Sequence, residues 1–486
     1  MIAFDFTQAE ESDVLLTSNS AFIHSNVNLE HSVLKFAAKF FNPWLKKTET
    51  ISEKSSILRL KKATMDSSQI LILYLVLFAL QFAWETLLNI LNMRNVRANA
   101  AAPPPAFADR VDAATYKKSI DYTITKTRFG IVSSLFSALV LLAVILSGAL
   151  GYLDDWLGQF QLGTFTHGVI YVFALALLFN LASLPFSLYS TFVIEEKFGF
   201  NKMTPKLYIL DMLKGLLLSA VLMAPLLYGL FWFMESAGRF WWLYAFLFIA
   251  GFQLLMVLLY PTLIAPLFNK FTPLEVGSLR ERILEMADKC GFRTNGIFKM
   301  DGSKRSKHSN AYFTGFGRSK RIVLFDTLIE SLTEPQVVAV LAHEIGHEKK
   351  KHIKKMLVLS MLSLLTGLFV LSLLLQLDAF FQAFGFVENS YHAAIVIFGF
   401  CAGPFTFFLS PLSSILSRKY EYQADRYAVD ATGSAEGLHG ALLKLSSENL
   451  SNLTPHPWYS FYHYSHPTLA ERLAAMDAYA AKVVKA

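Results

Sequence analysis

The stretch LAHEIGHEKKKH, Leu341–His352, places two histidines four residues apart, with a glutamate directly after the first. At 3.6 residues per turn, His343 and His347 lie one turn apart on the same face of a helix. Two imidazole nitrogens can then reach one zinc ion. Glu344 lies close enough to take a proton from an activated water without ligating the metal. This HExxH arrangement is typical of zinc proteases.

The residues before the histidine pair support a helix. Thr333 can cap it, Pro335 suits its first turn, and Gln336 stands where a capping box requires a glutamine or glutamate. Three fixed residues also occur by chance on surface helices, so the zinc interpretation depends on the rest of the chain.

Long apolar runs surround this pair. Of the 486 residues, 54% are hydrophobic and only 17% are charged, which is less charge than a soluble globule usually carries. The apolar residues are concentrated in blocks that are long enough to cross a bilayer, which takes about 20 residues as a helix. The sequence therefore predicts a mainly α-helical polytopic membrane protein. Its seven spans are expected at roughly Gln69–Asn92, Phe129–Gly151, His167–Ser190, Leu207–Met234, Phe240–Ile264, Met356–Leu377 and Ala393–Ser417.

The chain has a net charge of +7, but no basic run resembles a nucleic-acid-binding arm. We therefore interpret the placement of its lysines and arginines as a signal of membrane orientation. Lysines and arginines gather in the first, third and fifth loops and just after the last span. The second and sixth loops have none, and the fourth has only Arg239. We therefore expect the basic loops in the cytoplasm. The basic N-terminal tail does not fit this orientation, because the same count of spans would place it on the side of the membrane opposite the cytoplasm. Long tails follow the rule weakly, and synthesis starting at Met65 is an alternative.

Other parts of the sequence argue against further classes of protein. The segment 1–66 lacks the pattern of a cleavable signal peptide. Only Cys290 and Cys401 are present, and Cys401 lies in an apolar run, so a disulfide framework is not expected. A GxSxG motif is absent, so no acyl-enzyme is expected.

An open catalytic zinc site needs a third protein ligand. Two predicted spans separate the histidines from residue 418, so the chain returns there to the same side of the membrane. Glu421, in SRKYEYQADRYAVD, is then the best candidate, and a solvated acid paired with Arg418 or Lys419 is the alternative. Other acids are less suitable because they lie on the opposite side or point away from the pair, as expected for Asp378, Glu388 and Glu348.

Asp425 follows Glu421 by four residues and therefore lies on the same helical face. It can accept the remaining ring N–H of a ligand histidine, and we expect this histidine to be His343. A hydrogen bond of this kind, from a ligand histidine to a carboxylate that does not itself touch the metal, fixes the tautomer and orients the ring.

The segment SNAYFTGFGRSKRIVLFDTL, Ser309–Leu328, alternates in the manner of two strands joined by a turn at Gly315–Arg321. Its first strand, Asn310, Ala311, Tyr312 and Phe313, can act as an edge strand that pairs with an extended peptide substrate. An ordinary hairpin is the alternative.

Three motifs together, HEIGH, SRKYEYQAD and YHYSHPTLAERL, resemble the integral-membrane CAAX prenyl endopeptidases, zinc proteases that process prenylated proteins. TFVIEEKFGFN and PTLIAPLFNKFTPL are also similar to loops of that family. The resemblance covers about residues 69 to 475. It implies seven transmembrane helices that form a chambered, barrel-like bundle with the zinc site at one end, facing the cytoplasm. An inserted gluzincin-type metalloprotease domain would contain a small β-hairpin or sheet.

The resemblance also assigns residues. It implies that His343, His347 and Glu421 hold one zinc ion and that Glu344 is the catalytic base. The family's late His-Pro and following arginine correspond to His466 and Arg472. A donor near the zinc can stabilise the oxyanion, so we expect this role for His466, with Arg472 supporting it. Simple packing in the aromatic loop HPWYSFYHYSHP is the alternative.

This interpretation divides the chain into five parts. Residues 1–66 are an extension, 67–270 hold five spans, 271–355 the metallopeptidase domain, 356–417 two spans, and 418–486 the C-terminal part of the site. Polar residues within predicted spans indicate an interior that is not lipid, with pairing between helices or snorkelling as the alternative. They are Glu85, Asn180, Asp211 and Lys214.

The leading function is therefore a membrane zinc endopeptidase of the CAAX-processing type, with peptide or protein substrates that can be prenylated. A quality-control zinc protease is an alternative, although such relatives usually have fewer spans. A channel or scaffold without catalysis is another, although the complete motif set speaks against it. The membrane is either a bacterial inner membrane or the endoplasmic reticulum. The C-terminal AKVVKA lacks a dilysine signal, which favours the bacterial one.

Overall fold

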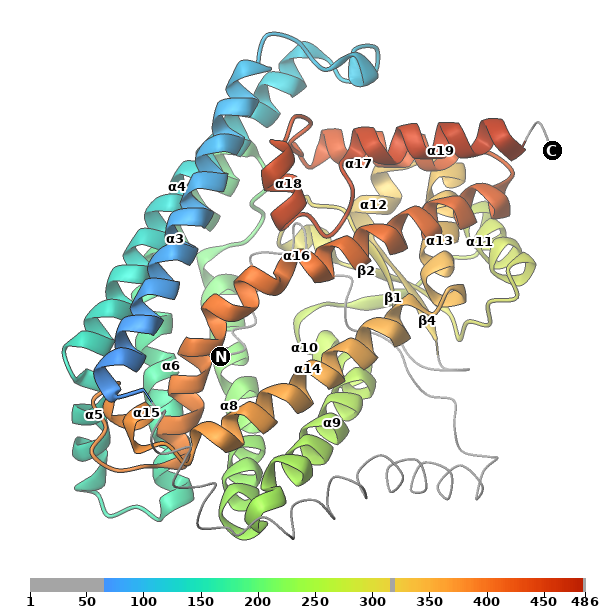
Figure 1. Ribbon diagram of the computed structural model, residues 1–486. Helices are drawn as coiled ribbons and strands as arrows, with labels where there is room; N and C mark the ends of the chain where they lie inside the picture. Colours follow the sequence, from blue (N-terminus) through green and yellow to red (C-terminus); the bar gives the residue numbers. More distant parts are fainter. Residues whose placement is uncertain (1–64, 315–319, 484–486) are drawn as a thin grey trace.

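Figure 1 shows a computed structural model of the chain, which describes residues 65–314 and 320–483. Seven helical segments within this part are long and apolar enough to cross a membrane, as predicted. They are built on α3 Ser67–Ala98, α4 Ala113–Leu146, α6 Thr164–Tyr189, α8 Pro205–Ser236, α9 Trp241–Leu259, α14 His352–Leu374 and α16 Tyr391–Thr432.

Two spans continue through π-helical turns. The third runs from α6 through η2 Ser190–Glu195 into α7 Glu196–Phe198, and the fifth from α9 through η4 Tyr260–Ile264 into α10 Ala265–Phe268.

The predicted bounds of two other spans differ from the structure because hydropathy detects only the apolar part of a helix. Helix α4 begins at Ala113, well before the apolar block that starts at Phe129. It ends at Leu146, where Gly148 at φ +75° turns the chain into α5, Ala149–Gly158. Helix α16 continues beyond the predicted end of its span and stops only at Thr432.

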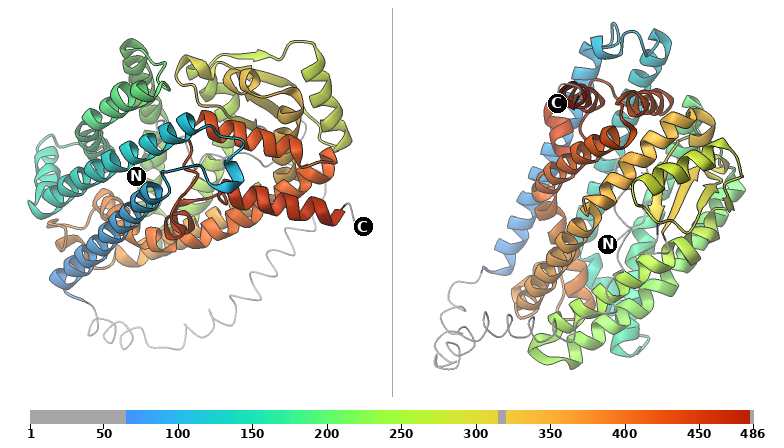
Figure 2. Two further views of the ribbon diagram at one scale, coloured as in Figure 1. Left: turned by 90° about the horizontal axis from the view of Figure 1, so that it is seen from above. Right: turned by 90° about the vertical axis from the view of Figure 1, so that its right-hand side faces the viewer.

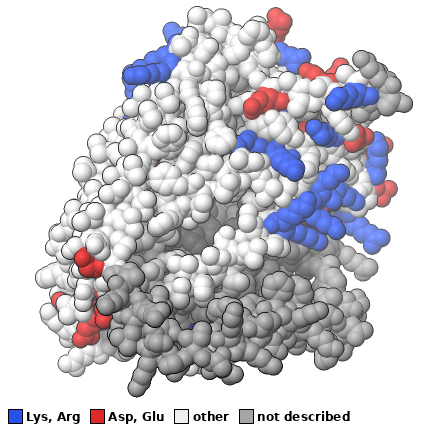
Figure 3. Space-filling view, viewed as in Figure 1, with Lys and Arg blue, Asp and Glu red and all other residues white. Residues whose placement is uncertain are grey.

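The bundle has two distinct ends (Figure 1). We call the end with α5 and α15, Asp378–Gln382, the distal end, and the end with the four-stranded sheet the sheet end. The chain alternates between them, so the basic loops meet at the sheet end and the loops poor in lysine and arginine meet at the distal end. Acidic side chains gather over α5 and α15 on the face in Figure 3.

The spans do not pack into a solid bundle. No more than 22% of the residues in the most apolar stretch of any span are buried within the chain. Helices packed around a solid core would bury their inward faces. The low burial shows that much of each span's apolar surface lies outside the packing of the chain, as expected for helices that face lipid.

The sheet contains β1 Phe271–Pro273, β2 Ile297–Met300, β3 Ala311–Thr314 and β4 Arg321–Phe325, in the order β1-β2-β4-β3. Strands β2 and β4 are parallel, and the other pairs are antiparallel. The predicted pairing of β3 with β4 is confirmed, and β3 is an edge strand. The predicted turn falls mainly on residues 315–319, outside the described residues.

Helix α13, Glu334–Lys349, lies between the sheet and α16 (Figures 1 and 2). The predicted capping box starts it, and the Thr333 N–H donates to Gln336 Oε1 at 2.9 Å. Val337, Leu341 and Ile345 pack into a core with β2, β4 and α11, Ser278–Lys289. This packing fixes the rotation of α13, so that its histidine face turns toward α16.

Short helices complete the sheet end and the connections. They are η1 Pro105–Phe107, η3 Gly238–Phe240, η5 Gly302–Lys304, α12 Asp326–Ser331, α17 Glu436–Glu448, α18 Pro457–His463 and α19 Leu469–Val483.

Candidate metal centre

Helices α13 and α16 bring His343, His347 and Glu421 together. The two Nε2 atoms lie 3.2 Å apart, His343 Nε2 is 3.4 Å from Glu421 Oε2, and His347 Nε2 is 3.2 Å from Glu421 Oε1. The three residues are 6%, 8% and 3% exposed. The three side chains predicted as zinc ligands therefore lie together in the structure, and their role as ligands stays a prediction.

A glycine permits this close approach of the two helices. A Cβ at Gly346 would lie 3.1 Å from Ala424 Cα and 3.1 Å from Tyr427 Cβ. Both distances are too short for ordinary van der Waals contact. The glycine of HEIGH, which lies between the two histidines, therefore lets α13 touch α16 directly.

The spacing of these donors fits a zinc ion. Four ligands at about 2.05 Å in a tetrahedron lie about 3.3 Å from one another. The two Nε2 atoms, 3.2 Å apart, match that value, and each lies within 3.4 Å of one oxygen of the Glu421 carboxylate, His343 near Oε2 and His347 near Oε1. Glu421 Oε2 is also buried without a hydrogen-bond partner, as expected of an oxygen that would face a cation.

The charge at the site also fits a divalent cation. Three carboxylates, Glu344, Glu421 and Asp425, and one guanidinium, Arg472, meet there. With neutral histidines their formal charge is −2, and buried charge of one sign needs compensation. A divalent metal neutralises it.

Asp425 lies behind His343, as predicted. Its Oδ1 is 2.8 Å from His343 Nδ1, the ring nitrogen that faces away from the cluster. The same carboxylate accepts from Arg472, with Nε to Oδ2 at 3.0 Å and the terminal nitrogen to Oδ1 at 2.6 Å. This fork of two hydrogen bonds is the strong geometry for arginine and carboxylate.

These contacts determine the protonation of the site when no metal is bound. Burial lowers the pKa of His343, but hydrogen bonds and charge from Asp425 and Glu421 outweigh it and raise the pKa to about 10. Burial also lowers the pKa of Arg472, whereas Asp425 and Glu421 raise it above its ordinary value overall. Arg472 is therefore a permanent charge that holds Asp425 ionised.

His352 is a residue of the site that sequence reasoning missed. Its Nδ1 lies 3.1 Å from His347 Nδ1, its Nε2 lies 2.9 Å from Gln423 Oε1, and its ring stacks on Tyr420. Lys351, at φ +59°, breaks the helix between α13 and α14 and folds His352 back. His352 thus stands behind His347 as Asp425 stands behind His343.

The proposed catalytic groups border the same cluster. Glu344 is half-buried beside the two histidines, and burial raises its pKa, while the charge of the histidines opposes the rise. His466 Nε2 lies 3.4 Å from Glu421 Oε1. Arg472 lies 3.6 Å from Glu421 but forms its hydrogen bonds with Asp425, so it is placed to organise that carboxylate.

The structure places the other predicted residues as follows. The edge strand β3 includes Ala311, Tyr312 and Phe313, while Asn310 directly precedes it. Strand β3 packs against α13, so its position is near the cluster.

Of the polar residues in the spans, two are paired. Asp211 forms an ion pair with Arg305 at 2.8 Å, and Lys214 donates to the Leu267 carbonyl at 2.9 Å, so pairing explains them better than a polar interior. Glu85 is half-buried, and Asn180 is exposed on the isolated chain.

Comparison with known proteins now identifies the family. Residues 273–480 match the description of peptidase family M48, and residues 92–270 match "CAAX prenyl protease N-terminal, five membrane helices". The chain belongs to peptidase family M48. This M48 peptidase is an integral-membrane zinc metallopeptidase with the chambered seven-span fold that the sequence predicted.

Several relatives resemble this M48 peptidase over most of their length. CAAX prenyl protease 1 of Saccharomyces cerevisiae is 39% identical over 82% of this chain and 93% of its own. The homologues of Oryza sativa and Homo sapiens are 36% and 34% identical and are covered over 95% and 92% of their length. The crystal structure of S. mikatae Ste24p superposes with a TM-score of 0.79 at 36% identity, over 85% of this chain and 99% of the other.

Proposed function

We propose that this M48 peptidase cleaves CAAX-type proteins near a prenylated C-terminus, with a single zinc ion held by His343, His347 and Glu421. The observation that carries the proposal is the cluster of two imidazole nitrogens 3.2 Å apart, each within 3.4 Å of an oxygen of the Glu421 carboxylate, with Glu344 beside them at one end of the membrane bundle. The names of the relatives support the CAAX substrate class.

Zinc, when bound, supplies a Lewis acid that polarises the scissile carbonyl and acidifies the attacking water. Glu344 takes the proton of this water and later delivers it to the leaving amine. Its raised pKa brings it nearer to neutrality, which suits a group that must both accept and donate. No side chain needs to form a covalent intermediate.

His466 can donate to the oxyanion of the tetrahedral intermediate. Burial lowers its pKa, with the charge of Glu421 opposing, so the ring is neutral and carries one proton. Ser465 Oγ lies 2.9 Å from Nδ1 and can donate to it. The ring proton then lies on Nε2, which faces the cluster. In this role Arg472 acts indirectly, because it holds Asp425 and through it His343.

The substrate would bind in an extended form against β3. Strand β3 is an edge strand among the four described strands, and an extended peptide can add to an edge strand by backbone hydrogen bonds. Asn310 through Phe313 would therefore position the peptide, while the chamber accommodates apolar parts of the substrate.

The sheet end would face the cytoplasm, since the basic loops meet there. Of the two membranes considered, we propose the endoplasmic reticulum, because the relatives named above come from yeast, rice and human. The zinc site would then act on proteins of the cytoplasmic face.

The test compares the purified protein with Glu344→Gln. We expect Glu344→Gln to keep its zinc and to lose hydrolysis of a prenylated CAAX peptide by at least about 100-fold, in line with general acid–base contributions of 10²–10⁴. Equal hydrolysis by both proteins would exclude Glu344 as the base. The same peptide without its prenyl group is the control for substrate class. If both peptides react equally, the CAAX assignment fails and a quality-control protease becomes the better interpretation.

A further inference from the structure

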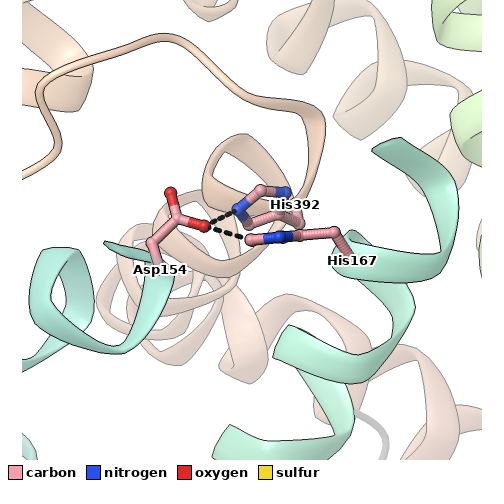
Figure 4. Close-up of side chains that lie close together, drawn as sticks. All are labelled: Asp154, His167 and His392. Carbon is pink, nitrogen blue, oxygen red and sulfur yellow. Dashed lines mark hydrogen bonds and ion pairs between the residues drawn. The ribbon is translucent and has the colours of Figure 1, made fainter. Parts of the chain in front are cut away.

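A second cluster of possible metal ligands lies at the distal end. Asp154 of α5, His167 of α6 and His392 of α16 point toward one another (Figure 4). Asp154 Oδ1 lies 2.6 Å from His167 Nε2 and 2.8 Å from His392 Nε2. Ser390 Oγ is 3.1 Å from the same nitrogen of His392. Two imidazole nitrogens and a carboxylate thus converge, as in the centre at the sheet end.

This cluster is separate from the first one. Both include a residue of α16, but His392 is the second residue of that helix and Glu421 lies in its last third. At 1.5 Å per residue, the interval from His392 to Glu421 corresponds to about 43 Å of helix, more than the roughly 30 Å of a bilayer's hydrocarbon core. The two clusters therefore lie at opposite ends of the membrane-spanning bundle.

Close packing holds the distal side chains in place. A Cβ at Gly168 would lie 3.2 Å from His392 Cβ, so this glycine lets α6 approach α16. The Tyr171 ring lies 4.7 Å from the His392 ring, and the Tyr171 hydroxyl donates to the Leu150 carbonyl. Helices α5, α6 and α16 are thus fixed around the cluster. The Asp154 side chain, 22% exposed, is the part with most freedom to move.

The charge of the surrounding connections favours a cation. The connections 147–163, 235–240 and 375–390 carry one basic residue, Arg239, and five acidic ones: Asp154, Asp155, Glu235, Asp378 and Glu388.

We propose that Asp154, His167 and His392 bind a second divalent transition-metal ion, with zinc as the ion that suits this donor set. The Asp154–histidine distances are about half an ångström shorter than the roughly 3.3 Å between zinc ligands. Without an ion the carboxylate therefore accepts hydrogen bonds from both rings, and it turns outward to admit one. The ion ties α5 to α6 and α16 and closes the distal end. This proposal does not depend on the proposed peptidase function.

The experiment counts zinc per chain by mass spectrometry on the full-length protein in nanodiscs, after dialysis against zinc. We expect two ions in the wild type, one in His392→Gln, one in His343→Ala/His347→Ala, and none when the three substitutions are combined. His439→Gln is the matched control, since His439 lies 3.5 Å from Asp477 without a third ligand among the described residues. It should keep two ions.

The outcomes separate the two sites. One ion in the wild type and none in His343→Ala/His347→Ala would overturn the distal site and leave the peptidase centre intact. One ion that is lost in His392→Gln but kept in His343→Ala/His347→Ala would support the distal site and contradict the other.

A second readout covers the case in which His392→Gln does not fold. Cobalt added to His343→Ala/His347→Ala should give the visible absorption of a tetrahedral site, and Asp154→Asn in that background should abolish it. Absence of this absorption would overturn the proposal.

Discussion

Replacing Asp425 by asparagine tests how the metal centre is supported. Asp425 accepts from His343 Nδ1 at 2.8 Å and from Arg472 at 3.0 and 2.6 Å. Asparagine keeps the size but has no charge and only one acceptor oxygen. The single amide oxygen cannot accept from both His343 and Arg472 as the carboxylate does, and Glu421, at 3.6 Å, is then the nearest remaining charge to Arg472.

Two separate effects are expected from Asp425→Asn. Loss of such a support for a ligand histidine lowers metal affinity by about 10- to 100-fold, or roughly 1.4 to 2.7 kcal/mol. Leaving a buried charge without its partner costs about 3 to 5 kcal/mol of stability. We expect the lower end, about 3 kcal/mol, because Glu421 still faces Arg472.

Zinc affinity is measured by competition with a chromogenic chelator, and stability by thermal unfolding in the same detergent. Asp430→Asn is the matched control, because Asp430 lies on the same helix and accepts only an exposed bond from Tyr479. The double variant Asp425→Asn/Arg472→Leu should recover part of the stability but not the affinity. Zinc affinity within twofold of the wild type in Asp425→Asn, with an unchanged melting temperature, would refute the reasoning.

Three further predictions concern the same centre. His352→Phe keeps the stacking on Tyr420 but loses the contact with His347, so zinc affinity should fall about tenfold in the chelator assay; unchanged affinity would remove His352 from the site. Gly346→Ala should destabilise the protein by about 1 to 3 kcal/mol through the short contacts with α16. Gly215→Ala, where a Cβ meets nothing within 4 Å, should leave the melting temperature at or above that of the wild type. Removing zinc with a chelator should abolish hydrolysis and lower the melting temperature, and added zinc should restore both; activity that survives complete zinc removal would exclude a metallopeptidase.

The spans and the first ligands could be predicted because their signals are local. An apolar block of about 20 residues is enough to predict a membrane span, and a spacing of four residues places two side chains on the same face of a helix. Glu421 needed one more step, the count of two spans that returns the chain to the same side. Asp425 followed from its spacing to Glu421. Each inference used only neighbouring residues or the number of crossings.

His352 could not be found in this way because helical geometry argues against it. On a continuous helix, a residue five positions after His347 points about 140° away from it. Only the left-handed conformation of Lys351 reverses this direction. Asp154, His167 and His392 carry no local signal at all, since three separate helices bring them together. The length of α4 was also missed, because the part of this helix before Phe129 is not apolar.

The depth of the metal centre bears on which substrates it can reach. Glu421 lies four residues beyond the last apolar block, or about 6 Å along α16, and α14 enters the membrane span at His352, five residues after His347. The cluster therefore lies close to the points where α14, which follows the helix of the histidine pair, and α16, which carries Glu421, enter their apolar membrane-spanning segments. A peptide bond close to a lipid anchor lies at this depth, whereas a soluble peptide must be drawn to it. If the substrate is prenylated, as proposed above, the effect of the prenyl group should thus appear mainly in KM, because the anchor supplies binding energy without contacting the reacting atoms.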